Sequence, residues 1–70
     1  MGLFGARIRR LREAAGLSQE ALAAPARLHP THISLIETGR RSVRIETIER
    51  LAKALRKSPA ALMPDLPARR

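Results

Sequence analysis

The sequence of 70 residues contains no cysteine, tryptophan or tyrosine, and its only aromatic residue is Phe4. The absence of cysteine excludes disulfides and thiolate chemistry, and it is compatible with a reducing cytoplasm. Because aromatic and β-branched residues are few while alanine and leucine are abundant, the composition favours helices over a sheet. A chain of this length forms one domain at most, with a small hydrophobic core.

Long apolar segments are also absent. No apolar run approaches the roughly 18 residues that a membrane-spanning helix needs. A secretory leader is not expected, because arginines interrupt the first apolar stretch at positions 7, 9, 10 and 12. The start Met1-Gly2 resembles an acylation signal, but Ala6 stands where that signal has serine or threonine. We therefore expect a soluble protein without a membrane partner.

The residue patterns that carry catalysis or bind metals are missing as well. The sequence has no paired carboxylates, no nucleophile–base set and no glycine-rich phosphate loop, so we do not expect an enzyme. The two histidines, His29 and His32, are three residues apart without cysteine or a carboxylate cluster beside them. Neither a metal nor another cofactor is therefore expected.

Positive charge is the strongest feature that is present. The 14 lysines and arginines outnumber the 6 acidic residues and produce a formal net charge of +8. Such an excess on a short chain favours a polyanionic partner, either nucleic acid or an anionic membrane surface. We favour nucleic acid, and the alternative is a basic surface that only keeps the protein in solution.

Apolar residues at helical spacing predict an all-α protein, a compact bundle of five helices. The first stripe consists of Phe4, Ile8, Leu11 and Ala15, and the fourth of Ile45, Ile48, Leu51, Ala52 and Leu55. The helices are expected near residues 3–15, 18–24, 30–38, 45–56 and 59–63. Residues 1–63 would form the domain, and residues 64–70 a frayed basic tail.

Glycine, proline and serine mark the expected helix ends. Gly16 and Gly39 suit the left-handed position after a helix, and Ser18 can cap the next one with its hydroxyl. Pro25 is expected to end the second helix, because its ring would collide with the carbonyl of the preceding turn. Pro30 suits the first position of the third helix. Before the last helix, Ser58 is expected to be the capping residue and Pro59 the first helical residue.

Three segments together resemble the phage-repressor type of helix-turn-helix domain, the superfamily of Cro and lambda repressor. They are LSQEAL at 17–22, ISLIETGRR at 33–41 and LAKAL at 51–55, and the resemblance covers about residues 7–63. It implies that helix 18–24 crosses the DNA backbone and that helix 30–38 is the recognition helix in the major groove. The short connection between these two helices is consistent with this arrangement, because it lets them pack at a steep angle with the second helix exposed on one side.

The recognition helix is expected to bury Ile33 and Ile36. By resemblance, the base-contacting residues are Thr31, His32, Ser34 and Leu35. Hydroxyl groups can form single hydrogen bonds with base edges, and the leucine suits a thymine methyl. Because arginine, asparagine and glutamine are absent from this set, methyl contacts, water and DNA shape are expected to contribute to specificity. Pro30 also corresponds to a base-contacting position of the family, but we interpret it as the residue that starts the helix. Ser34 could equally be an exposed residue that contacts only solvent.

Contacts with phosphates are assigned to Gln19, Arg40, Arg41 and Arg44. The resemblance places Gln19 on a phosphate and against the recognition helix, and free amides at a helix start bind anions in any case. Arg44 lies at the expected start of the fourth helix, where a cation is disfavoured by the helix dipole unless a phosphate is near. The alternative for the arginines is simple solvation.

Two further predictions concern the structure around the turn. The resemblance implies an internal ion pair between Arg12 and Glu37 that fixes the recognition helix to the first helix. Arg27 occupies a turn position where the family usually has a left-handed glycine. We hypothesise that Pro25 ends the helix early, so that the chain reaches Leu28 without a left-handed residue at position 27.

Relatives of this type commonly dimerise, which places two recognition helices about 34 Å apart on a palindromic site. The expected homodimer interface consists of Leu62, Met63 and Leu66, although Leu62 and Met63 could instead close the monomer core. The expected function is sequence-specific binding of double-stranded DNA by a transcriptional regulator, a repressor, in the cytoplasm at the nucleoid. RNA polymerase or a toxin-type protein is left open as a further partner. The alternatives are an antitoxin-type interaction module and a protein that coats nucleic acid without specificity.

Overall fold

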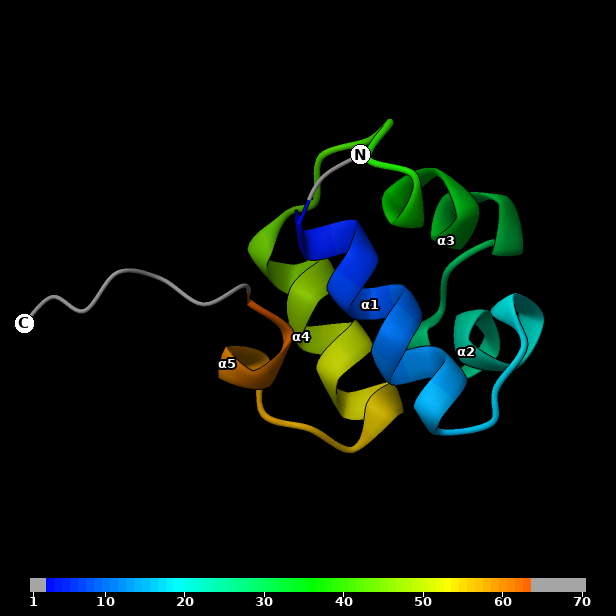
Figure 1. Cartoon of the computed structure of the whole chain (residues 1–70), viewed down its shortest axis with the longest axis vertical. Helices are drawn as coiled ribbons and strands as arrows, with labels where there is room; N and C mark the ends of the chain where they lie inside the picture. The colour runs from blue at the N-terminus through cyan, green and yellow to red at the C-terminus, as the bar shows by residue number, and fades with distance from the viewer. Residues whose placement is uncertain (1–2, 64–70) are drawn as a thin grey trace, which may run out of the picture.

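The computed structural model describes residues 3–63, and within them the chain forms five α-helices and no strand (Figure 1). The helices are α1 (Leu3–Ala14), α2 (Gln19–Ala26), α3 (Pro30–Glu37), α4 (Ile45–Leu55) and α5 (Pro59–Leu62). Helix α3 packs against α1 and α2, and α4 packs against α2 and α5. The predicted all-helical class is confirmed. The predicted tail and Leu66 lie outside the described residues.

Most of the predicted helix ends are confirmed, because they depend on local chemistry. The Ser18 hydroxyl accepts a hydrogen bond from the backbone N–H of Ala21 at 2.9 Å and so caps α2. Gly16 and Gly39 follow helices with φ of 73° and 74°, a left-handed conformation that suits glycine. Ser58 precedes α5, but its side chain forms no capping hydrogen bond.

The hypothesis about Pro25 and Arg27 is wrong. Helix α2 continues through Pro25 to Ala26, and Arg27 takes the left-handed conformation with φ 60° and ψ 42°. This conformation lets the N–H of Leu28 reach the carbonyl of Ala23 at 3.0 Å, the long hydrogen bond that closes a helix end. Ala26, the last residue of α2, is fully buried. Packing and this helix-end hydrogen bond therefore outweigh the missing proline N–H and the strain at Arg27.

Replacing Arg27 with glycine is expected to raise the free energy of unfolding by about 1 kcal/mol, because an L-residue in this conformation is strained. Arg56, with the same φ of 60° after α4, offers the matched variant Arg56→Gly. Denaturant unfolding of both variants checks the prediction. A loss of stability in both would contradict it, since the left-handed backbone would then be cheaper for arginine than for glycine.

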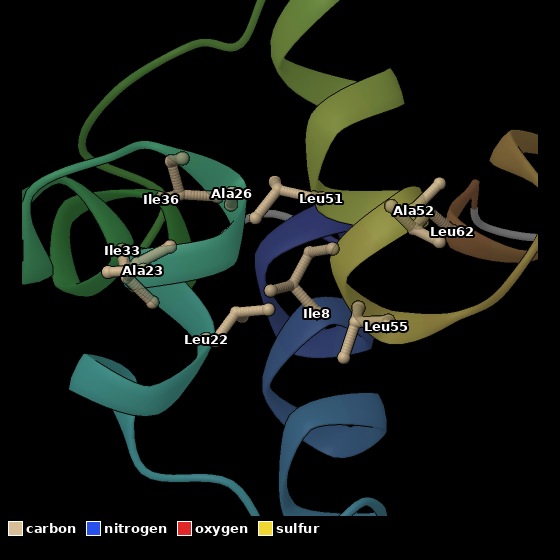
Figure 2. Packing of buried hydrophobic residues seen from close by; sticks show 10 residues of the cluster. All are labelled: Ile8, Leu22, Ala23, Ala26, Ile33, Ile36, Leu51, Ala52, Leu55 and Leu62. Atoms are coloured by element: carbon tan, nitrogen blue, oxygen red, sulfur yellow. The ribbon is translucent and has the colours of Figure 1, made fainter.

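The hydrophobic core lies between the helices and contains side chains from all of them. Its buried members are Ile8, Leu22, Ala23, Ala26, Ile33, Ile36, Leu51, Ala52, Leu55 and Leu62. Figure 2 shows Ile8 of α1 near the centre, with side chains of α2 and α4 around it. Among the helices of residues 3–63, none is both long enough and apolar enough to cross a membrane.

Three predictions about apolar residues are corrected by the packing. Ala15, expected on the first stripe, is exposed beyond the end of α1, and Ile45, expected on the fourth, is 75% exposed in the first turn of α4. Leu62, assigned to the dimer interface, is fully buried under the other helices. Its side chain closes the monomer core and is not available to a partner, whereas Met63 is 39% exposed.

Candidate nucleic-acid interface

Helix α3 has one face in the core and the opposite face turned outward. Ile33, Ile36 and Glu37 are buried, as predicted for the two isoleucines. Thr31 is exposed, whereas Ser34 and Leu35 are half-buried and lie one turn further along the same outward face. His32 lies at the edge of this face and is also half-buried. These four side chains, predicted to contact bases, are thus brought together on one helix.

The N-terminus of α3 is fixed by a residue that sequence reasoning did not place. Pro30 begins the helix, as predicted, and His29 precedes it at the capping position. The Nδ1 atom of His29 accepts a hydrogen bond from the backbone N–H of Thr31 at 3.1 Å. The place of His29 immediately before a helix-starting proline was a signal for this role, although histidine is not among the usual caps.

The C-terminus of α3 is closed by local hydrogen bonds. The Thr38 hydroxyl donates to the carbonyl of Ser34 at 2.9 Å, and the N–H of Arg40 donates to the carbonyl of Leu35 at 2.9 Å. Gly39 permits the second bond through its left-handed conformation. The backbone that carries the outward face is therefore defined at both ends.

The predicted ion pair between Arg12 and Glu37 is present and joins α1 to α3. The Nε and Nη2 atoms of Arg12 donate to the two carboxylate oxygens of Glu37 at 2.7 and 3.2 Å. Only 11% of the arginine side chain and 3% of the glutamate side chain are exposed. The hydrogen bond with Glu37 raises the pKa of the Arg12 guanidinium above its ordinary value, against the opposing effect of burial. The guanidinium is therefore charged at neutral pH.

The same carboxylate also holds the start of α2. The Gln19 Nε2 donates to a Glu37 oxygen at 3.1 Å, and Nη1 of Arg12 donates to the carbonyl of Leu17 at 2.8 Å. A side-chain amide has two N–H donors, so Gln19 keeps one for another acceptor. The contact between Gln19 and the recognition helix agrees with the sequence prediction. Helices α1, α2 and α3 are thus held by a single hydrogen-bonded network.

Exposed cations follow the recognition helix. Arg40, Arg41 and Arg44 all lie on the surface of the segment between α3 and α4. Arg44 occupies the position before α4, as predicted, and its side chain forms no capping hydrogen bond. These exposed guanidinium groups make the segment after α3 positively charged, which suits a polyanion. Among residues 3–63 no group of acidic or histidine side chains could hold a metal ion.

Comparisons with known proteins agree with this geometry. The model of a helix-turn-helix domain family matches residues 3–65. The control protein C.BamHI of Bacillus amyloliquefaciens is 44% identical over 62 residues, which are 87% of this chain and 76% of that protein. The restriction-modification controller protein C.AhdI of Aeromonas hydrophila superposes with a TM-score of 0.84 and 43% identity, covering 86% of this chain and 91% of that one.

A repressor structure is similar at lower identity. The P22 c2 repressor, solved in complex with a synthetic operator, has a TM-score of 0.80 and 32% identity, covering 90% of this chain and 96% of that one. The family match spans nearly the whole chain, and helices α2 and α3 flank the short turn at residues 27–29. The chain therefore belongs to the helix-turn-helix domain family, and its fold is of the phage-repressor type.

Proposed function

We propose that this protein is a transcriptional regulator that binds a specific site in double-stranded DNA through the outward face of α3. The observation that carries the proposal is that this helix has one face buried in the protein and the opposite face turned outward. Ile33, Ile36 and Glu37 anchor it in the protein, while Thr31 and Leu35 are turned away from the core. The P22 c2 repressor, which is bound to operator DNA in its structure, supports the same use of the fold.

Specificity would come from the four outward side chains. Thr31 and Ser34 can each exchange one hydrogen bond with a base edge, and Leu35 can contact a thymine methyl group. His32, at the edge of the face, can reach a base or a phosphate. Because none of these side chains forms a bidentate pair with a base, DNA shape and bridging water would supply part of the discrimination.

Phosphate contacts would hold α3 in the groove. The free N–H of the Gln19 amide and the backbone N–H groups at the start of α2 suit one phosphate. Arg40, Arg41 and Arg44 suit the backbone on the other side of α3, since they are exposed and follow it directly. These contacts contribute affinity without sequence preference.

A single domain with few base contacts binds weakly, so the regulator would act as a homodimer on a palindromic operator. Met63 remains a candidate interface residue because it is partly exposed, and Leu66 remains one from the sequence. Occupancy of the operator would repress transcription, and contact with RNA polymerase or a toxin-type protein would be an additional property. Its place of action would be the cytoplasm, at the nucleoid. No catalytic activity is proposed.

The proposed function is tested by selecting binding sites from random duplexes and measuring affinity against salt concentration. A palindromic consensus is expected, with log K falling by about 0.9 per phosphate contacted for each unit of log salt. Salt-dependent binding with no consensus would instead support nonspecific coating. The absence of DNA binding would favour an antitoxin-type interaction module.

Two single substitutions separate specificity from affinity. We expect Leu35→Ala to relax the preference at one thymine position, with a cost of about 1–3 kcal/mol on the consensus duplex only. Arg41→Ala should weaken binding to all duplexes alike and reduce the magnitude of the salt slope by about 1. Titrations of both variants with consensus and scrambled duplexes check the prediction. Equal losses on both duplexes for Leu35→Ala would remove this residue from the specific contacts.

A further inference from the structure

The cap of the recognition helix is a titratable side chain. His29 has an extended backbone before α3, and its Nδ1 accepts the hydrogen bond from the N–H of Thr31 at 3.1 Å. Because Nδ1 is the acceptor, the proton of the neutral ring lies on Nε2. Thr31 is the first residue of the outward face, so this bond defines the backbone where the proposed base contacts begin.

Imidazole can serve as this cap only while it is neutral. Protonation places a hydrogen on Nδ1, so that the ring turns a donor toward the N–H donor of Thr31. It also places a positive charge at the N-terminus of α3, where the helix dipole disfavours a cation. Imidazole ordinarily changes its charge between about pH 5 and 8, whereas serine and asparagine caps do not titrate there.

The charged groups of the neighbouring elements do not replace the lost hydrogen bond. On α2, Glu20 lies in the first turn, at the end remote from His29, whereas Arg27 closes the near end. On α3, Glu37 lies at the far end and is bound to Arg12 of α1. His32 follows one turn later. Among residues 3–63, no carboxylate forms an ion pair with His29.

We propose that His29 is a positioning residue of the recognition helix and that its protonation weakens operator binding. The inference rests on the proposed function of α3, because it assumes that Thr31 begins the base-contacting face. The neutral ring holds the first turn in the geometry that binds DNA. The protonated ring releases the Thr31 N–H, so a larger part of the binding energy is used to order that turn.

The test compares the wild-type chain with His29→Asn, which retains a capping acceptor that does not titrate, and with His29→Ala, which has no cap. Affinity for the selected consensus duplex is measured from pH 8 to pH 5 at constant ionic strength. The affinity of the wild type relative to His29→Asn should fall about fivefold over this range. His29→Ala should bind about fivefold more weakly than the wild type at pH 8 and approach it at pH 5.

Because His32 is common to all three proteins, its own titration cancels in these ratios. A ratio of wild type to His29→Asn that stays constant overturns the proposal. A ratio that rises at acidic pH also overturns it, because the imidazolium would then act mainly by attracting phosphate.

A measurement on the free protein separates this proposal from the proposed function. The exchange rate of the Thr31 amide proton, corrected for its intrinsic pH dependence, should show loss of protection in step with the titration of the His29 ring. It should show no such step in His29→Asn. If the step is present but no duplex is bound, the cap stands and the proposed function fails. If the step is absent while the duplex is bound, the cap proposal fails alone.

Discussion

Arg12→Met is expected to lower the free energy of unfolding by about 3–5 kcal/mol, because it leaves the Glu37 carboxylate buried without its ionic partner. The carboxylate is 3% exposed, so water cannot replace the two hydrogen bonds that the guanidinium donates at 2.7 and 3.2 Å. Methionine retains most of the apolar stem of the arginine, which keeps the loss of packing small. Urea unfolding monitored by far-ultraviolet circular dichroism measures the difference.

The chain contains a matched control for this substitution. Arg9 and Glu13 form an ion pair at 3.1 Å on the same helix, but their side chains are 64% and 54% exposed. We expect Arg9→Met to change stability by less than about 1 kcal/mol, because solvent screens an exposed pair. The double variant Arg12→Met/Glu37→Met should recover much of the stability that Arg12→Met loses, since no buried charge remains. Equal effects of Arg9→Met and Arg12→Met would contradict our account of the buried pair.

Gly5→Ala is the second substitution with a large expected effect. A Cβ atom on Gly5 would lie 2.7 Å from the backbone oxygen of Glu37 and still closer to that of Ile36. Both are backbone atoms at the end of the recognition helix, so α1 and α3 must move apart. We expect a loss of about 1–3 kcal/mol, although alanine is the better helix former by about 1 kcal/mol.

The consequence for DNA binding distinguishes this clash from ordinary destabilisation. Gly16→Ala supplies the comparison, because no atom lies within 4 Å of its added Cβ and the strain comes only from φ of 73°. Both variants should unfold more easily, but only Gly5→Ala should weaken binding to the consensus duplex under conditions where each is folded. Thermal unfolding and duplex titration together check this prediction. Unchanged affinity of Gly5→Ala would show that α3 tolerates the movement.

The residues that stabilise the protein at the ends of α3 also position the face that is proposed to bind DNA. Glu37 ends the recognition helix, pairs with Arg12 of α1 and accepts a hydrogen bond from Gln19 of α2. Gly5 allows α1 to approach the same end of α3. His29 defines the other end. The outward face of α3 therefore has a fixed position relative to the phosphate-binding candidates on α2 and after α3, which specific recognition of a duplex requires.

The features that the sequence predicted correctly depend on residues close together in the chain. The start of α2 follows from the hydroxyl of Ser18, and the buried side of α3 follows from the three-residue spacing of Ile33 and Ile36. Capping and helical periodicity act within one or two turns, so their effects can be inferred from neighbouring letters. The pairing of Arg12 with Glu37, 25 residues apart, was predicted only through the family resemblance.

Sequence alone thus determined that this chain is a basic, all-helical member of a DNA-binding family and which side of α3 faces outward. Tertiary structure decided the left-handed Arg27, the exposed Ile45, the buried Leu62 and the close approach at Gly5. Each of these depends on which distant segment occupies the neighbouring space. Arg27 takes a conformation that local preference disfavours at the end of a helix whose last residue, Ala26, is fully buried. A balance between packing and local strain cannot be derived from adjacent residues.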